Sequence, residues 1–156
     1  MLHSYKMSFQ GELLKRGFWL YVWDIKGDKR HLYVGRTGDY SSPNASSPFR
    51  RIGQHLDARI NAKGNTLAKR LREARVDCET CTFEMIAIGP IYPEQTTMAT
   101  HLQFRDKTSA LERALADELR ERGYEVLGKH DTKRPTDTSL LSQVLDLISE
   151  SFPSLN

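Results

Sequence analysis

The sequence predicts one small domain of the α/β (α+β) class, in which helices flank a mostly antiparallel sheet of about three strands. The chain has 156 residues, enough to bury one core but too few for two domains of ordinary size. Segments rich in aromatic and β-branched residues, typical of strands, alternate with segments whose apolar residues recur at helical spacing. We therefore treat residues 1–156 as a single domain.

The first two predicted strands form a hairpin. Phe18 to Ile25 is almost entirely apolar and aromatic, as expected of a largely buried strand. A turn at 26–29 leads into a return strand from Arg30 to Arg36. A third strand is predicted from Thr82 to Ile88, ended by Gly-Pro, and a short edge strand from Tyr124 to Leu127.

Two helices are predicted between the hairpin and the third strand. A polar loop rich in serine and proline runs from Thr37 to Pro48, where Ser47 is expected to cap the first helix. The core stripe of that helix is Phe49, Ile52, Leu56 and Ile60. The inward residues of the second helix are Leu67, Leu71 and Ala74.

Two further helices are predicted in the second half of the chain. Residues 91–104 have little periodicity and are expected to form a loop. Ser109 and Glu112 have the spacing of a capping box, which would begin a helix that ends at Gly123. After a polar connector, Ser139 would cap an amphipathic helix at 139–151, whose apolar residues are Leu140, Leu141, Val144, Leu145 and Ile148.

Positive charge is concentrated in one segment. The whole chain carries a net charge of +3, whereas residues 50–75 contain eight basic and two acidic residues, a local charge of +6. Such a cluster is expected to meet a phosphate-rich partner, although a solvated helix surface would also explain it. The candidate nucleic-acid-binding residues are Arg50, Lys63, Lys69, Arg70, Arg72 and Arg75.

Composition predicts a cytoplasmic protein without membrane contact. No window approaches the roughly 20 apolar residues of a membrane span, and the first 16 residues lack the pattern of a signal peptide. The two cysteines, Cys78 and Cys81, are spaced C-x-x-C. A zinc site completed by His101 and His130, or a redox pair, would account for them, but ordinary reduced cysteines beside a strand are the favoured interpretation.

The polar groups around the hairpin are those that phosphodiester hydrolysis requires. That reaction needs a group to activate water, cations to stabilise the phosphoryl oxygens, and usually a metal at the leaving oxygen. The side chains suited to these roles are Tyr21, Tyr33, Arg36, Arg51, His55 and Glu112. Each also has an ordinary explanation, as a strand aromatic, an exposed i, i+4 pair or a helix cap. Their spacing alone does not show that they converge.

The order of these residues resembles the motifs of the GIY-YIG nuclease superfamily from about residue 17 to residue 127. The first motif corresponds to Trp19-Leu20-Tyr21, and the second to Tyr33-Val34-Gly35 with a basic residue next. An Arg and a His four residues apart, and then a helical Glu, correspond to Arg51, His55 and Glu112. Trp19 stands where the family usually has glycine. Gly128 stands near a family asparagine, for which Lys129 or His130 is the candidate replacement.

The resemblance implies a GIY-YIG-like fold with a nuclease core at 17–127 and an endonuclease that attacks nucleic acid, with DNA as the expected substrate. Tyr21 would be the general base or part of its relay, and Tyr33 would orient the water or the phosphate. Arg36 and Arg51 would favour an ionised tyrosine, and Arg51 would also stabilise the transition state. His55 would bind phosphate or assist proton transfer. Glu112 would hold one Mg²⁺ or Mn²⁺ ion.

Two other functions remain open from the sequence. The Trp19 and Gly128 departures allow a module that binds nucleic acid on the same fold without cleaving it. Alternatively, the protein is a structural domain in which the basic segment meets an acidic partner and the C-terminal helix forms a homodimer.

Overall fold

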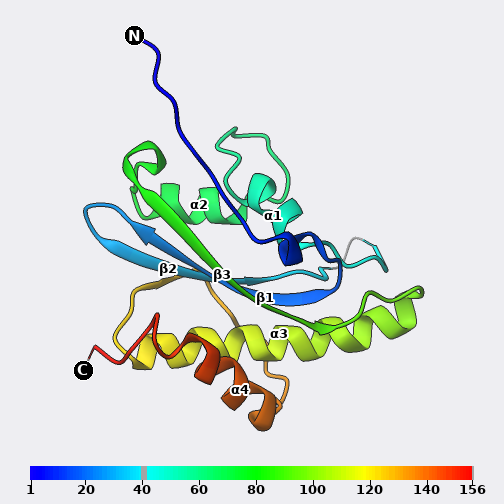
Figure 1. The fold of residues 1–156 in the computed structure, drawn as a ribbon. Coiled ribbons are helices and arrows are strands. Elements are labelled where there is room, and N and C mark those ends of the chain that lie inside the picture. Colours follow the sequence, from blue (N-terminus) through cyan, green and yellow to red (C-terminus); the bar gives the residue numbers. More distant parts are fainter. Residues whose placement is uncertain (40–41, 156) are drawn as a thin grey trace.

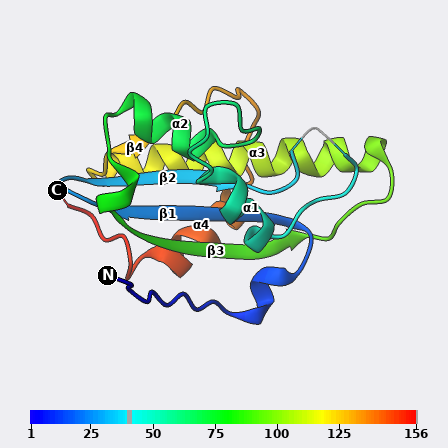
Figure 2. The same ribbon diagram turned by 90° about the horizontal axis from the view of Figure 1, so that it is seen from above.

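The computed structural model describes residues 1–39 and 42–155, and within them the chain forms one mixed sheet with helices on both faces (Figure 1). Its strands are β1 (Phe18–Lys26), β2 (Arg30–Arg36), β3 (Thr82–Tyr92) and β4 (Val126–Leu127). Their order is β3-β1-β2-β4, so that β1 lies between β2 and β3 (Figure 2). The small α+β class is confirmed, but the described residues contain four strands rather than about three.

The fourth strand determines what lies beside the hairpin. β1 pairs antiparallel with β2 and with β3, whereas β4 pairs parallel to β2. β4 is held through only two residue pairs, Leu32 with Val126 and Tyr33 with Leu127. The short edge strand predicted from Tyr124 to Leu127 is thus confirmed in its last two residues. Because β4 ends beside Tyr33, the chain from Gly128 onward is placed next to that tyrosine.

The helices form one layer on each side of the sheet. In Figure 1, α1 (Pro48–His55) and α2 (Thr66–Glu73) cover one face, and α3 (Met98–Glu121) and α4 (Thr138–Ile148) cover the other. Short 3₁₀ turns occur at η1 (Gly11–Leu14) and η2 (Cys78–Thr80). Among the described residues, no helix combines the length and the apolar character needed to cross a membrane.

The alternation of side chains along β1 divides the core into two layers. Leu20 and Val22 pack in a cluster with residues of α3 and α4, whereas Tyr21 and Trp23 pack on the opposite face with residues of α2. Both layers are buried because β1 is an inner strand and helices cover both faces of the sheet. Tyr21 is only 1% exposed. The polar hydroxyl of Tyr21 therefore faces the layer beneath α1 and α2 and must find its partners there.

The first two helices begin as predicted but are shorter. Ser47 caps α1, its hydroxyl accepting the N–H of Arg50 at 3.3 Å, and Pro48 is the first helical residue. α1 ends at His55, so Ile60 lies outside it and is 81% exposed, which makes its prediction as a core residue wrong. The predicted inward position of Ala74 is also wrong, because α2 ends at Glu73 and Ala74 is exposed.

The prediction of a loop at 91–104 is wrong at both ends. β3 continues through Gly89-Pro90 to Tyr92, and α3 begins at Met98, capped by Thr97. The Thr97 hydroxyl accepts the N–H of Thr100 at 3.3 Å. Ser109 and Glu112 therefore lie inside the helix and do not form a capping box. Figure 1 shows this end of α3 extending past the sheet, where few side chains are buried and apolar periodicity is weak.

The end of α3 and the C-terminal helix largely follow the prediction. Gly123, with φ of +99°, follows the last turn of α3 in the conformation that favours glycine. The cap of α4 is Asp137 rather than Ser139, its carboxylate accepting the N–H of Leu140 at 3.0 Å. Val144 and Ile148 of α4 are buried in the core layer with α3. This apolar stripe is thus used within the chain, and the homodimer remains a prediction.

The predicted polar loop after the hairpin includes residues 40 and 41, which lie outside the described residues. Thr37 at its start bridges the two strand ends, because its hydroxyl donates to the carbonyl of Gly17 at 2.5 Å and accepts the N–H of Trp19 at 2.9 Å. This contact holds the open end of the hairpin, from which the loop passes to α1.

Candidate functional site

Tyr21 and His55, separated by 34 positions in the sequence, meet beneath α1. The hydroxyl of Tyr21 lies 2.5 Å from Nε2 of His55 and 3.1 Å from the carbonyl oxygen of Arg36. Both side chains are buried, with exposures of 1% and 2%. The ring of Tyr33 packs against the same imidazole, with centroids 5.5 Å apart. The structure therefore brings three of the predicted residues into one buried cluster.

The glycine after the second tyrosine explains how the Tyr21 ring reaches His55. Tyr21 is paired with Gly35 across the hairpin. A Cβ added to Gly35 would lie 2.7 Å from Cζ and 2.8 Å from the hydroxyl oxygen of Tyr21, closer than Cβ atoms approach such atoms. Only glycine at this position lets the ring cross β2. Tyr33-Val34-Gly35 thus supplies one aromatic group and the space for another.

Hydrogen-bond counting assigns the proton of His55. Nδ1 of His55 is buried without a hydrogen-bond partner among the described residues. If Nε2 carries the hydrogen, it donates to Tyr21, whose own hydroxyl donates to the carbonyl of Arg36. The other tautomer would bury an unpaired N–H, which costs more than an unpaired lone pair. Burial, followed by the charge of Arg51, lowers the pKa of His55 to about 3. The imidazole is therefore neutral at pH 7.

Burial also keeps both tyrosines protonated in the free protein. It raises the pKa of Tyr21 well above its ordinary value and that of Tyr33 to about 12. Arg51 lowers the pKa of both phenols, but by less than burial raises it. The cations thus act in the expected direction, since Arg51 lowers the pKa of both phenols and Arg36 lowers that of Tyr33. Burial outweighs them, because exclusion of water disfavours the charged phenolate, and both tyrosines stay protonated in the free protein.

Arg36 and Glu112 form the second part of the cluster. Nε of Arg36 donates to Oε2 of Glu112 at 2.9 Å, and Nη1 donates to the carbonyl of Gly38 at 3.1 Å. The side chains of Arg36 and Glu112 are only 19% and 18% exposed to solvent. Burial raises the pKa of Glu112, against the lowering effect of Arg36. α3 thus delivers the predicted carboxylate to the end of β2.

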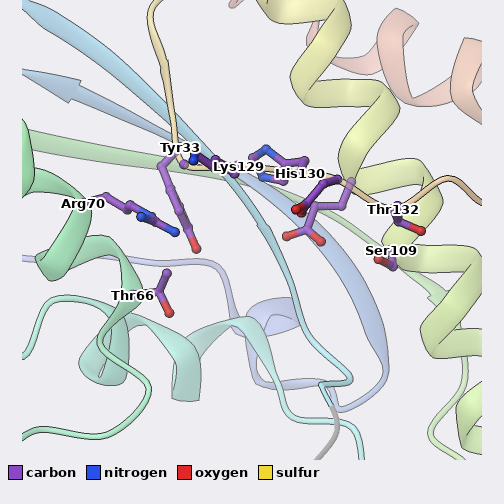
Figure 3. Close-up of a pocket in the computed structure, with 10 residues that line it drawn as sticks. Tyr33, Thr66, Arg70, Ser109, Lys129, His130 and Thr132 are labelled. Carbon is purple, nitrogen blue, oxygen red and sulfur yellow. The ribbon is translucent and has the colours of Figure 1, made fainter.

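A polar pocket of about 320 Å³ opens beside Glu112. Its lining comes from β2, α2, α3 and the chain after β4, and consists of Tyr33, Thr66, Arg70, Ser109, Glu112, Gly128, Lys129, His130, Asp131 and Thr132. Figure 3 shows Tyr33 and Arg70 on one side of this pocket, with Ser109 and Thr132 across from them. Of the six predicted catalytic and metal residues, Tyr33 and Glu112 line the pocket directly.

His130, a candidate replacement for the family asparagine near Gly128, is hydrogen-bonded to the hairpin. Its Nε2 lies 3.2 Å from the carbonyl of Val34, and its Nδ1 lies 3.4 Å from Nη2 of Arg120. Arginine only donates, so Nδ1 accepts and Nε2 donates. The same Arg120 nitrogen donates to the carbonyl of Gly128 at 3.1 Å. Arg120 therefore holds this connector at the pocket, and nothing in the sequence pattern distinguished it from other helix surface arginines.

The pocket suits a divalent metal held by one carboxylate rather than by a cage. No group of three or more His, Cys, Asp or Glu side chains that could hold a metal exists in the described part of the chain. Oε1 of Glu112 has no hydrogen bond among the described residues, and Ser109 and Thr132 line the same pocket. Mg²⁺ commonly binds through one or two carboxylates and completes its shell with water and phosphate. The residues present fit that mode.

The predicted basic patch is divided among separate places. Among the described residues that line the pocket beside Glu112, the lysine and arginine side chains are Lys129 and Arg70. Arg50 and Lys63 line a different cavity beside α1, and Arg75 lines a third next to the hairpin turn. Lys69 and Arg72, on the outward face of α2, line none of these three cavities. Arg72 donates to the carbonyl of Ala58 at 3.0 Å.

Trp19, at the glycine position of the first motif, does not obstruct the cluster. Its indole N–H donates to the carbonyl of Lys15 at 3.1 Å. Its ring lies over Gly89 of β3, where an added Cβ would be 2.9 Å from Cδ2. The β1–β3 register is irregular between Phe18 and Leu20, so Trp19 is accommodated at a bulge. Tyr21 still reaches His55.

The cysteines lie away from this cluster, beside the start of β3. Both Cys78 and Cys81 are free and partly buried, and the thiol of Cys81 donates to the carbonyl of Asp77 at 3.3 Å. The two histidines considered as zinc partners are engaged elsewhere: Nε2 of His101 lies 2.9 Å from the carbonyl of Asp39, and His130 is bound at the pocket.

Comparison with family models, curated proteins and solved structures found no match for this chain.

Proposed function

We propose that this protein is a metal-dependent endonuclease that hydrolyses phosphodiester bonds of nucleic acid, with DNA as the expected substrate. The observation that carries the proposal is the pocket in which Tyr33, Glu112 and Arg70 meet, with the Tyr21–His55 contact directly behind Tyr33. These residues include those through which the sequence resembles the GIY-YIG nucleases. A carboxylate, a phenol and cations around one polar cavity are suited to phosphoryl chemistry.

Glu112 is the residue that would hold Mg²⁺ or Mn²⁺, and Ser109 and Thr132, which line the same pocket, offer hydroxyls to metal-bound water. A metal held at Glu112 would supply Lewis-acid polarisation of a phosphoryl oxygen and would stabilise the leaving oxygen. Arg36 is bonded to the same carboxylate, which keeps Glu112 oriented and supports its ionised form despite burial.

The cations of the pocket bind the substrate phosphate. Arg70 lies across the cavity from Ser109 and Thr132, and its side chain is held by Glu73 at 3.0 Å. Lys129 adds a second positive charge on the side of β4. Their charges would attract the phosphate and stabilise the additional negative charge of the transition state.

Tyr33 is the group best placed to position the attacking water, because its hydroxyl carries both a donor and an acceptor and it lines the pocket with Glu112. It accepts a proton from that water only when it is ionised. Tyr21 and His55 act behind it: the neutral imidazole packs edge-on against both phenol rings and fixes them. In this proposal Tyr21 positions the cluster rather than serving as the base.

A second candidate is a nucleic-acid-binding module without catalysis. The observation in its favour is the protonation state of the cluster, in which burial leaves both phenols neutral and the imidazole uncharged. Such a module would use the cations of the pocket to hold a phosphate and would not require the metal.

The deciding experiment incubates the purified protein with supercoiled and branched DNA in the presence of Mg²⁺, Mn²⁺ or EDTA. We expect cleavage that needs the metal and is lost in Glu112→Gln and Tyr33→Phe. The matched control is Glu84→Gln, which removes an exposed carboxylate on β3 that pairs with Lys26. Its activity should equal that of the native protein.

Cleavage in EDTA, or full activity of Glu112→Gln, would overturn the assigned mechanism. Absence of cleavage with binding that weakens steeply as salt increases would favour the binding module. Absence of both would favour a structural domain with a protein partner.

A further inference from the structure

A second cavity, of about 480 Å³, lies beside α1 and is distinct from the pocket at Glu112. Four basic residues line it, Arg16, Arg50, Arg51 and Lys63, and they come from the chain before β1, from α1 and from the loop after α1. Asp39 is the one acidic residue among its described lining residues. Segments that are distant in sequence therefore gather positive charge around one hollow.

Two of these cations are not engaged by carboxylates. Arg16 is bound to Glu94 at 2.8 Å, and Arg51 lies 3.5 Å from Asp39. Among the described residues, neither Arg50 nor Lys63 has an ion-pair partner. Both are exposed, so they can move towards a ligand at little cost. The cavity therefore retains positive charge after its internal ion pairs are formed.

The wall of the cavity also contains buried polar atoms without partners. Nε of Arg51 and the hydroxyl oxygen of Ser46 have no hydrogen bond among the described residues, although both atoms are buried. Gly64, with φ of +74°, leaves the space beside Arg51 open: an added Cβ would lie 3.7 Å from Nη1 of Arg51. Unpaired buried donors are costly, and an anion with several oxygens would satisfy them.

Arg36 joins this cavity to the pocket at Glu112. One end of its guanidinium donates to Glu112 and the other donates to the carbonyl of Gly38, which lines the second cavity. Hydrogen bonds of one side chain thus link a lining residue of each hollow. A polyanion carries several phosphates and can offer one to each hollow, whereas an anion with a single phosphate can fill only one.

We propose that the second cavity binds a non-scissile phosphate of the same nucleic-acid strand whose scissile phosphate lies at Glu112. The proposal rests on the proposed function and adds a subsite to it. Phosphate contacts of this kind determine the register of a strand without reading its sequence. The protein would therefore need a substrate that continues beyond the cleaved bond, and the second site would set which bond is cleaved.

The test measures binding in EDTA, so that it does not depend on cleavage. A fluorescent single-stranded oligodeoxynucleotide is compared with copies in which one phosphate at a time is replaced by an uncharged methylphosphonate. Each is titrated with the native protein and with Arg50→Ala/Lys63→Ala, which removes the two free cations. The control is Lys6→Ala/Lys29→Ala, which removes the same charge from the N-terminal segment and the hairpin turn.

For the native protein and the control, we expect one methylphosphonate position to lower affinity by about tenfold, as for loss of a charged phosphate contact. For Arg50→Ala/Lys63→Ala, the same replacement should change affinity by less than about twofold, because the contact is already absent. The sensitive position must differ from the bond that is cleaved when Mg²⁺ is added.

Equal sensitivity of the native protein and Arg50→Ala/Lys63→Ala at every position would overturn the subsite while leaving the nuclease proposal intact. If the native protein does not cleave DNA in Mg²⁺ but shows the expected methylphosphonate sensitivity in EDTA, the nuclease proposal is overturned and the phosphate site is supported. A further titration uses inorganic phosphate alone. If inorganic phosphate binds in an Arg50- and Lys63-dependent manner but the oligonucleotide pattern is absent, the site takes free phosphate and the proposal is wrong.

Discussion

The hydroxyl oxygen of Tyr21 lies 2.5 Å from Nε2 of His55, a contact that joins an inner strand of the sheet to the last residue of α1. Both residues are buried and neutral. The contact is therefore a hydrogen bond between uncharged groups that fixes the position of two aromatic side chains. The properties of this pair and of its neighbours lead to four predictions.

Gly35→Ala should destabilise the protein by about 1–3 kcal/mol, the usual cost of forcing an extra methyl into a packed site. The new Cβ would collide with the Tyr21 ring and separate it from His55. Urea denaturation measures the change in the free energy of unfolding. Gly53→Ala is the matched control, because no atom lies within 4 Å of its added Cβ and α1 should gain about 0.5–1 kcal/mol. Equal effects of the two substitutions would contradict the steric role of Gly35.

His55 should make the native protein less stable as pH falls. The pKa of His55 is about 3 in the folded protein and 6.5 in the reference state. Between these pH values the unfolded chain binds a proton at His55, whereas the folded chain does not. The contribution of neutral, buried His55 to the free energy of unfolding is fully present above pH 6.5 and is lost as the pH falls towards 3. The loss is on the order of 5 kcal/mol at its largest, since each pKa unit corresponds to about 1.4 kcal/mol.

Denaturation of the native protein and of His55→Gln across pH 4–8 tests this. Glu112, whose pKa is raised, acts in the opposite sense at acidic pH, but it is present in both proteins and cancels in the difference. The difference in stability should change with pH for His55→Gln and stay constant for His3→Gln, a substitution in the exposed N-terminal segment. A pH-independent difference for both would show that His55 titrates normally.

If Tyr33 accepts the proton of the attacking water, kcat/KM should rise with pH up to about 10. Its pKa of about 12 means that the ionised fraction grows about tenfold for each pH unit in this range. Tyr33→Phe should stay without cleavage across this pH range, whereas Tyr5→Phe, which alters an exposed tyrosine, should show the same rise as the native protein. A profile that is flat above pH 8 for the native protein would exclude Tyr33 as the base.

Arg36→Gln should raise the pKa of Glu112 further, because the carboxylate would lose its hydrogen-bonded cation while remaining largely buried. We expect a loss of about 2 kcal/mol or more in the free energy of unfolding. Carbon-detected NMR titration of the Glu112 carboxyl measures the first effect. Arg16→Gln breaks the more exposed pair with Glu94 and should cost less than about 1 kcal/mol. A carboxyl pKa that does not move in Arg36→Gln would contradict the coupling.

Local patterns in the sequence predicted much of the fold. The hairpin, the Ser47 cap and the Gly123 helix end all depend on contacts within a few residues, and each is present in the structure. The short edge strand expected within Tyr124 to Leu127 is also present, as β4. The beginning of α3 was missed, because that end of the helix carries few buried apolar residues and so little periodicity.

For the candidate site, the sequence by itself determined which chemical groups are available: two phenols, two guanidinium groups, an imidazole and a carboxylate in a recognisable order. Only the tertiary structure decided that Tyr21 meets His55, that Arg36 holds Glu112, and that the basic segment is divided between separate cavities. It also decided that the tyrosines stay protonated. The reason is physical: residue identity and spacing determine local conformation and reactivity, but proximity and exclusion of water depend on how distant segments pack, and these set the pKa of each group.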